Sequence, residues 1–182
     1  MRRLTILTSA MAFSLAMAGT ALAAETAGAA PAATAGPAAG PSDKALIQAL
    51  ERGFTAAFNA KDSKKIMSYY AREGLFVFDV APPRQHVGWT DYKKDWDDIF
   101  ATFPGPTTFK LSDVSITVAG DVAYGHSIQD ANFTTKDGMK TELVVRVTDV
   151  YRKIGGKWFI VQEHVSIPVD LNTMKPDPMS KP

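Results

Sequence analysis

Three acidic residues interrupt otherwise apolar segments of this chain. Asp79 ends the run Leu75–Asp79, Asp149 lies in a valine-rich segment, and Glu163 lies in a similar segment nearer the C-terminus. Burying an unpaired carboxylate is costly, so such a group either finds a partner or keeps its proton. Acids in that position are candidates for general acid or base chemistry. We therefore expect Asp79 and Asp149 to exchange protons with a ligand and Glu163 to contact it.

The same carboxyl groups also have a purely structural interpretation. Asp79 could cap the turn that follows it, and Asp149 could form an ion pair with Arg146 or Arg152. At the level of sequence the two interpretations have about equal weight.

A second set of polar residues alternates with the acids along the last two segments. It consists of Arg146, Thr148, Gln162, His164 and Ser166. His164 is a candidate catalytic residue because histidine titrates near neutral pH and a neighbouring arginine favours its neutral form. The alternative is that this set forms the polar interface of a homodimer.

The remaining candidates for ligand contacts are mainly aromatic or basic. They are Trp89, Tyr92, Trp96, His126 and Arg146. The aromatic side chains suit the wall of a mostly apolar pocket. The three histidines, at positions 86, 126 and 164, lack the short spacing typical of a metal site, so no metal is expected.

Several motifs that would indicate other chemistry are missing from the sequence. Cysteine is absent, and neither a glycine-rich phosphate loop, a dinucleotide fingerprint nor a Gly-x-Ser-x-Gly motif occurs. Disulfides and thiolate catalysis are therefore excluded, and no cofactor is expected.

Helices should come first along the folded part of the chain. Apolar residues at helical spacing predict a helix over 43–59 with Asp43 as its N-cap. Asp62 is expected to cap a shorter second helix that stops before Gly74, and Thr90 to cap a third.

Strands should follow the helices. Residues 75–79 predict one short strand, and four longer strands are predicted between glycine-containing turns: 108–119, 121–134, 140–153 and 157–168. The short connections predict an antiparallel meander. Helices followed by strands are typical of an α+β fold with helices packed on one sheet face.

Several short strings in this region are similar to those of a known family. They are Phe78-Asp79 before Pro82-Pro83, Gly88 with Tyr92 and Trp96, His126-Ser127, Arg146-Val147-Thr148-Asp149, Gly156-Lys157-Trp158 and His164-Val165-Ser166-Ile167-Pro168. Over about residues 44–170 the chain resembles the SnoaL-like proteins of the nuclear transport factor 2-like superfamily, which includes ketosteroid isomerase. The resemblance implies a cone-shaped fold, a curved antiparallel sheet with three N-terminal helices packed on its concave face.

The resemblance also implies roles for individual residues. In ketosteroid isomerase an aspartate base is opposed by a tyrosine and a protonated aspartate. Asp79 falls at the position of the base and Asp149 at that of the protonated acid. Phe54 falls at the position of the tyrosine and has no hydroxyl group, which disfavours that particular reaction. Gln162 stands where related proteins often have the first histidine of a pair.

The turn between the last two strands has two possible forms. A three-residue loop, Ile154–Gly156, pairs Lys153 with Lys157 and Arg146 with His164, whereas a two-residue glycine loop shifts every pair by one. We expect the three-residue loop, because it resembles the family's usual turn.

That register predicts which face of the sheet each side chain occupies. The more apolar face should be covered by the helices, and it should carry Asp149 and Glu163 together with Phe159 and Val161.

The N-terminus has the layout of a secretory signal. Arg2 and Arg3 precede an uncharged apolar run and the small-residue site Ala21-Leu22-Ala23. We expect a signal peptide over 1–23, an Ala/Pro/Gly-rich linker over 24–41, the folded domain over 42–170 and a flexible tail over 171–182. The protein is then periplasmic or secreted, with no membrane insertion after cleavage.

Charge excludes one class of partner. Without Arg2 and Arg3 the chain has 18 Lys and Arg against 19 Asp and Glu, so nucleic acid is not an expected partner.

Two hypotheses about function remain. The first is an exported domain that binds a small, largely apolar organic molecule, with or without cofactor-free acid/base chemistry of the isomerase or lyase type. The second is a non-catalytic homodimeric binding or assembly module.

Overall fold

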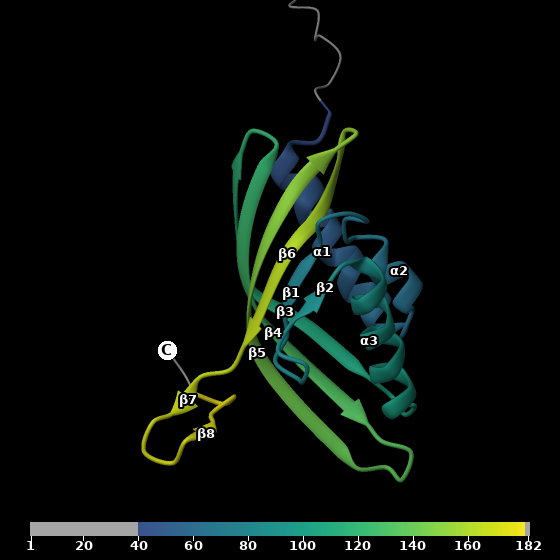
Figure 1. Cartoon of the computed structure of the whole chain (residues 1–182), viewed down its shortest axis with the longest axis vertical. Helices are drawn as coiled ribbons and strands as arrows, with labels where there is room; N and C mark the ends of the chain where they lie inside the picture. The colour runs from purple at the N-terminus through teal and green to yellow at the C-terminus, as the bar shows by residue number, and fades with distance from the viewer. Residues whose placement is uncertain (1–39, 181–182) are drawn as a thin grey trace, which may run out of the picture. The chain divides into compact units, whose positions relative to one another are not determined.

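The computed structural model describes residues 40–180, which form an α+β domain. Its helices are α1 (Asp43–Asn59), α2 (Ser63–Met67) and α3 (Trp89–Thr102). Its main sheet contains β1 (Phe76–Phe78), β2 (His86–Val87), β3 (Thr108–Ala119), β4 (Val122–Thr134), β5 (Lys140–Ile154) and β6 (Lys157–Ser166). The sheet curves around the helices, which cover one of its faces (Figure 1). The predicted α+β class and cone-like fold are confirmed.

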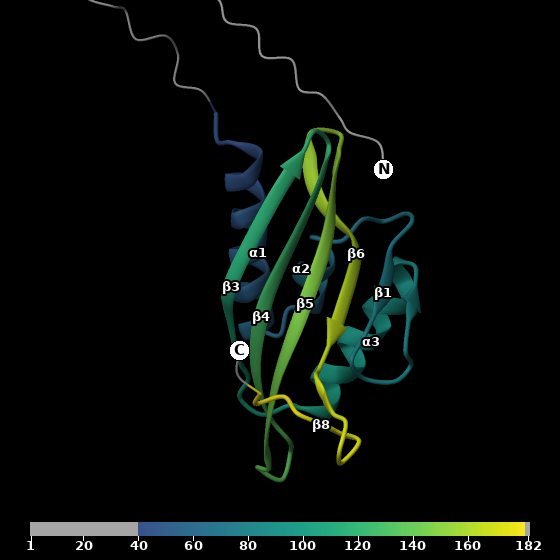
Figure 2. The ribbon, with the colours of Figure 1, turned by 90° about the vertical axis from the view of Figure 1, so that its left-hand side faces the viewer.

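The strand order of the main sheet is β2-β1-β6-β5-β4-β3, and Figure 2 shows the long strands side by side. The ladders from β3 to β6 are antiparallel, as the short connections predicted. Strand β1 instead joins β6 in parallel, with Val77 opposite Glu163. This parallel pairing was not predicted, and it brings the end of β1, where Asp79 lies, next to the acid-bearing part of β6.

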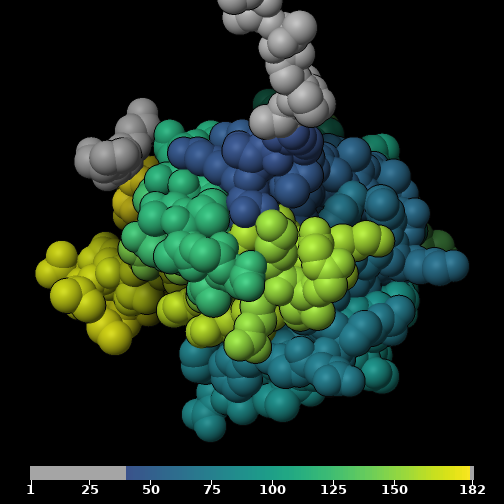
Figure 3. Space-filling view, turned by 90° about the horizontal axis from the view of Figure 1, so that it is seen from above, coloured from purple at the N-terminus to yellow at the C-terminus, as the bar shows by residue number. Residues whose placement is uncertain are grey.

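Helix α1 has the predicted bounds but a different cap. Ser42 is the N-cap, and its hydroxyl accepts a hydrogen bond from the backbone N–H of Ala45. Asp43 is therefore the first helical residue instead of the cap. Its carboxylate accepts hydrogen bonds from Trp158 at 2.9 Å and lies 2.8 Å from the ammonium of Lys153. These contacts hold the start of α1 beside the turn between β5 and β6, as seen from above in Figure 3.

Of the predicted caps of the other two helices, one is confirmed and one is wrong. Asp62 caps α2 as predicted, accepting from the N–H of Lys65 at 2.8 Å. The predicted Thr90 cap of α3 is wrong, because the helix starts earlier and Gly88 occupies the cap position with a φ of 92°. Glycine adopts a positive φ without strain, whereas other residues do so at a cost. Gly88 can therefore hold the non-helical cap conformation, and the helix begins at the next residue.

The β5–β6 turn is the two-residue form, so the predicted three-residue loop is wrong. Ile154 pairs with Lys157, and Gly155 and Gly156 both have positive φ, 57° and 78°. Two positive φ values are what a tight hairpin turn of the primed type requires, and two consecutive glycines adopt them at little cost.

A bulge farther along this hairpin shifts the pairing again. It lies where Tyr151 pairs with Ile160 but Val150 pairs with Gln162, so Val161 is the extra residue. Between the turn and the bulge, Trp158 and Ile160 are the buried residues, and the predicted burial of Phe159 and Val161 is wrong.

Beyond the bulge, the faces agree with the prediction although the partners do not. Asp149 and Glu163 are both buried on the helix-covered face, as expected. Arg146 pairs with Ser166 and His164 with Thr148, so the predicted pairing of Arg146 with His164 is wrong.

Aromatic side chains fill the space between helices and sheet. Phe58 stacks on Phe109 with ring centroids 4.3 Å apart, and Phe54 packs edge-on against Trp96 at 5.9 Å. Burial of each such ring contributes roughly 3 kcal/mol. This aromatic core forms one wall of the cavity described below.

Two short strands lie near the C-terminal end of the described residues. Strands β7 (Val169–Asp170) and β8 (Lys175–Pro176) form a small separate antiparallel pair. Within residues 40–180, no helix has the length and apolar character needed to cross a bilayer. The predicted signal peptide and nearly all of the linker lie outside the described residues.

Candidate functional site

A mostly apolar cavity of about 270 Å³ lies between the helices and the sheet. Its apolar lining includes Phe54, Phe58, Trp96, Phe109, Phe133 and Val145. Asp79 and Glu163 are the two carboxyl groups that reach it among the described residues, and Tyr92 and Gln129 add further polar atoms. An apolar pocket with a few convergent polar groups is typical of a small-molecule site.

Glu163 is the polar centre of this cavity wall. It is 4 % exposed, and its two carboxylate oxygens accept hydrogen bonds from the hydroxyl groups of Tyr70 and Tyr92, each at 2.7 Å. Burial raises the pKa of Glu163 to about 7, although the two tyrosine hydroxyls act in the opposite direction. At neutral pH this carboxyl group can therefore both give and accept a proton.

Asp149 lies behind Glu163, directly opposite it on the neighbouring strand. Its burial, followed by the charges of Glu163 and Glu51, raises the pKa of Asp149 well above its usual range. Two adjacent carboxyl groups in an apolar setting share protons because both cannot ionise at low cost.

The buried network continues from Asp149 to helix α1. The hydroxyl of Tyr151 donates a 2.8 Å hydrogen bond to Glu51 and lies 3.4 Å from Asp149. Glu51 is 6 % exposed, and burial raises its pKa. None of the described arginines or lysines forms an ion pair with Glu51, Asp149 or Glu163. The proposed structural pairing of Asp149 with an arginine is therefore not observed.

Asp79 caps a turn, as the structural interpretation predicted, and it also lines the cavity, whereas its predicted proton exchange stays a prediction. Its Oδ1 accepts hydrogen bonds from the N–H groups of Val80 at 2.5 Å and Ala81 at 3.4 Å, so it caps the turn after β1. Its side chain also lines the cavity. Burial raises the pKa of Asp79, and those backbone N–H groups oppose the rise.

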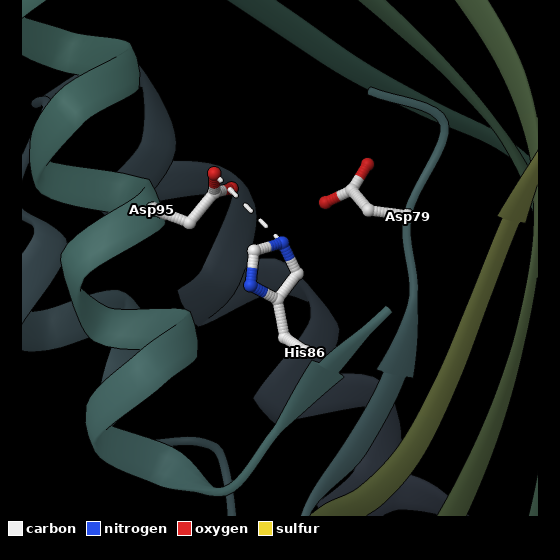
Figure 4. Close-up of side chains that lie close together, drawn as sticks. All are labelled: Asp79, His86 and Asp95. Carbon is white, nitrogen blue, oxygen red and sulfur yellow. Dashed lines mark ion pairs between the residues drawn. The ribbon is translucent and has the colours of Figure 1, made fainter. Parts of the chain in front are cut away.

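A second polar cluster lies beside Asp79 and was missed by sequence analysis. His86 on β2 is 3 % exposed, and its ring lies between Asp79 and Asp95 of α3 (Figure 4). Burial raises the pKa of Asp95, and Oδ1 of Asp95 lies 3.8 Å from Nε2 of His86. Seven and nine residues separate these side chains along the chain, which is not a recognisable local motif.

The other predicted ligand contacts divide into two groups. Tyr92 and Trp96 line the cavity as expected. Trp89 does not: its indole N–H donates to the carbonyl of Met67 at 2.8 Å, and the Arg72 guanidinium stacks on its ring at 3.6 Å. That arrangement fixes the start of α3 to α2.

The remaining predicted candidates, two histidines and one arginine, lie away from the cavity. His126, Arg146 and His164 are exposed, because strand alternation directs them to the face opposite the buried acids. None of them contributes to the cavity lining. Phe54, at the position where the resemblance implies a tyrosine, does line it.

Sequence reasoning also missed part of the network around Glu163. The sequence analysis did not identify Glu51, Tyr70 or Tyr151 as candidate site residues. A buried tyrosine usually finds a hydrogen-bond partner, and this was the one signal that could have linked Tyr70 and Tyr151 to buried acids.

Comparison with known proteins agrees with this architecture. The sequence matches the SnoaL-like domain family over residues 47–170, so the chain belongs to that family. No curated protein sequence matches the chain.

Solved structures share the fold. An NTF2-like protein of unknown function from Pseudomonas putida is 29 % identical, with a TM-score of 0.68 over 79 % of this chain and 100 % of that one. A ketosteroid isomerase-like protein from Erwinia carotovora is 21 % identical, with a TM-score of 0.58 over 67 % of this chain and 93 % of that one. A suggested scytalone dehydratase from Novosphingobium aromaticivorans is 17 % identical, with a TM-score of 0.61 over 75 % of this chain and 93 % of that one. The protein is therefore a cavity-bearing SnoaL-like domain.

Proposed function

We propose that this domain binds a small, largely apolar organic molecule carrying one oxygen function, and that Glu163 exchanges a proton with it. The cavity is slightly smaller than the 300 Å³ at which pockets for drug-sized ligands begin, so a molecule of one or two rings suits it. The observation that carries the proposal is a buried carboxyl group at the wall of an apolar cavity, held by two tyrosine hydroxyls.

The chemistry that fits this arrangement is isomerisation or elimination without a redox step. Glu163 as a carboxylate takes a proton from a carbon next to an electron-withdrawing oxygen function. In an isomerisation the carboxylic acid returns the proton to another carbon of the same molecule. In an elimination the electron pair left by the proton forms a double bond, and the leaving group departs with its own pair. Asp79, at the end of the neighbouring strand β1, also lines the cavity and is a second group able to accept or donate a hydrogen bond.

Asp149 acts as a positioning residue in this proposal. It does not line the cavity, and its effect on a ligand passes through Glu163. The structural relatives support the class of reaction only in general terms, since one is described as isomerase-like and another as a suggested dehydratase.

Binding can be tested with 2-naphthol, a fluorescent bicyclic aromatic with one hydroxyl group. We expect saturable binding that is lost in Ala81→Trp, because Ala81 is an exposed residue on the cavity lining and the new ring fills the space. Ala101→Trp, at an exposed position of α3 outside the lining, is the matched control and should bind normally. Equal binding by both variants would contradict the cavity as the ligand site.

Proton exchange needs a separate test. Hydrogen–deuterium exchange at the α-carbons of small cyclic ketones, followed by mass spectrometry, reports proton abstraction without a known product. We expect Glu163→Gln to lose at least about 100-fold of any catalysed exchange. Exchange that persists in this variant would assign the reaction to another group.

A non-catalytic homodimer remains the second candidate. It is favoured by Phe54, which cannot donate a hydrogen bond, and by the outer face of the sheet, where His126, Arg146 and His164 are exposed and no described helix covers them. Light scattering at micromolar concentration would show a dimer, and the substitutions Arg146→Glu and His164→Glu should dissociate it. A monomer at every concentration would exclude this candidate.

Export is likewise a proposal. It rests on the layout of residues 1–23 alone. Expression of the full chain in a bacterium should yield a periplasmic product that starts at Ala24, which the intact mass of the purified protein would reveal. An intact mass that includes residues 1–23 would argue against cleavage.

A further inference from the structure

We propose that Asp79, His86 and Asp95 bind a divalent transition-metal ion of the Zn²⁺ class at the edge of the cavity. One ligand atom from each residue lies within 4.8 Å of the other two. The residues come from three different elements, the end of β1, strand β2 and helix α3, and their side chains converge (Figure 4). Carboxylate and imidazole groups are ordinary ligands for such an ion.

The distances suit ligands of one ion better than hydrogen-bond partners. Nε2 of His86 lies 3.8 Å from Oδ1 of Asp95, which is too long for a hydrogen bond. Two ligands bound tetrahedrally at about 2.0 to 2.2 Å lie about 3.3 to 3.6 Å apart. The three ligand atoms lie within 4.8 Å of one another, so they have to approach by up to about 1.3 Å when an ion binds.

The orientation of His86 supplies an independent argument. Nδ1 lies 3.2 Å from Oδ2 of Asp91, which also accepts the backbone N–H of Val87 at 3.2 Å. A carboxylate that holds one ring nitrogen and leaves the other for a metal is a recurring arrangement in metalloproteins. Here Nε2 has no hydrogen-bond partner, although the side chain is only 4 % exposed.

The local charge also favours a cation. Asp79, Asp91 and Asp95 surround a single histidine, and none of the described lysines or arginines forms an ion pair with any of them. Burial of two of these carboxyl groups without a positive partner is costly. A divalent ion bound between Asp79 and Asp95 compensates for both of these negative charges.

Three protein ligands leave one position of a four-coordinate site free. Because the side chain of Asp79 lines the cavity wall, we expect this free position to face the cavity. Bound there, the ion would supply a Lewis acid for an oxygen atom of the ligand. This inference does not depend on the proposed function: Asp79 becomes a metal ligand, and proton exchange remains with Glu163.

The test uses the purified mature protein after dialysis against EDTA. Isothermal titration with ZnCl₂ should show one site, and Co²⁺ should give a visible absorption spectrum characteristic of low coordination number. Asp95→Asn and His86→Gln should each weaken Zn²⁺ binding at least ~10-fold. Asp98→Asn, on the same helix but with an exposed carboxylate paired to Lys94, and His126→Gln are matched controls and should bind as the parent does.

Either of two results would overturn the metal site. They are the absence of saturable Zn²⁺ binding, or equal binding by Asp95→Asn and its Asp98→Asn control. Because Asp95 is partly exposed, its replacement should preserve the fold even if His86→Gln does not, and circular dichroism verifies this. Glu163→Gln should retain Zn²⁺ binding while losing proton exchange, so failure of one proposal is distinguishable from failure of the other.

Discussion

Asp149 and Glu163 face each other across adjacent antiparallel strands with both carboxyl groups buried, 3 % and 4 % exposed. Opposed like charges in a sheet are destabilising, and burial multiplies the cost. The pair is tolerated because it keeps at least one proton at neutral pH, which links the stability of the fold to the protonation of the site.

Stability should fall as pH rises from about 5 to about 8. The folded-state pKa of Glu163, about 7, is above its ordinary value of 4.5, so the folded state binds more protons than the unfolded state between these values. The contribution is complete below pH 4.5 and is lost as pH rises through about 7. That difference corresponds to roughly 3 kcal/mol. Urea unfolding across this range measures it.

The control for this pH dependence is Glu163→Gln, which cannot ionise. Its unfolding free energy should vary much less between the same two pH values. Carboxyl groups with a lowered pKa, such as Asp97 and Asp137, act only below the acidic end of this range. A parent protein whose stability is constant or rises with pH would contradict the protonated pair.

Asp79→Asn should lower the pKa of Glu163 below about 7, because the charge of Asp79 is one of the causes that raise this pKa. The amide resembles a carboxyl group in shape and cannot become a like charge. Carbon-13 NMR of the glutamate carboxyl groups follows the titration. An unchanged or higher Glu163 midpoint would show that the charge of Asp79 does not act on Glu163.

Tyr92→Phe should raise the pKa of Glu163 further, because one of the two hydroxyl groups that favour its ionised form is removed. The loss of a hydrogen bond to a buried carboxyl group costs about 1.5 to 3 kcal/mol of stability. The same carbon-13 titration and urea unfolding report both effects. Tyr69→Phe is a suitable control, since Tyr69 lies one residue before Tyr70 but forms no side-chain hydrogen bond to Glu163. Equal pKa values in the two variants would count against the tyrosine contacts.

Phe58→Ala should destabilise the domain by about 3 to 5 kcal/mol and also weaken 2-naphthol binding. Phe58 is 4 % exposed, stacks on Phe109 and lines the cavity, so its removal enlarges the cavity from the core side. Leu46→Ala, at a residue that is 37 % exposed on α1, should cost much less. Thermal unfolding compares the two, and similar losses would mean that the aromatic core carries little of the stability.

Local patterns in the sequence were sufficient for most elements. The bounds of α1 and of the long strands follow from apolar spacing, which reflects a regular backbone period and needs no knowledge of distant residues. The same argument placed Asp149 and Glu163 on the buried face, because side chains alternate along each strand whichever strand lies beside it.

The contacts between elements could not be obtained in this way. The bulge at Val161 and the parallel pairing of β1 with β6 depend on how several strands pack at once. Sequence alternation is unchanged by either feature, so neither left a local signal.

Thus the sequence alone determined the fold class, the order of the elements and the burial of an acidic pair, since all three follow from short-range periodicity and composition. Only the tertiary structure decided that Glu163 meets two tyrosines and that His86 lies between Asp79 and Asp95. Those groupings join residues from separate elements, and their chemistry arises from distances that chain order does not constrain.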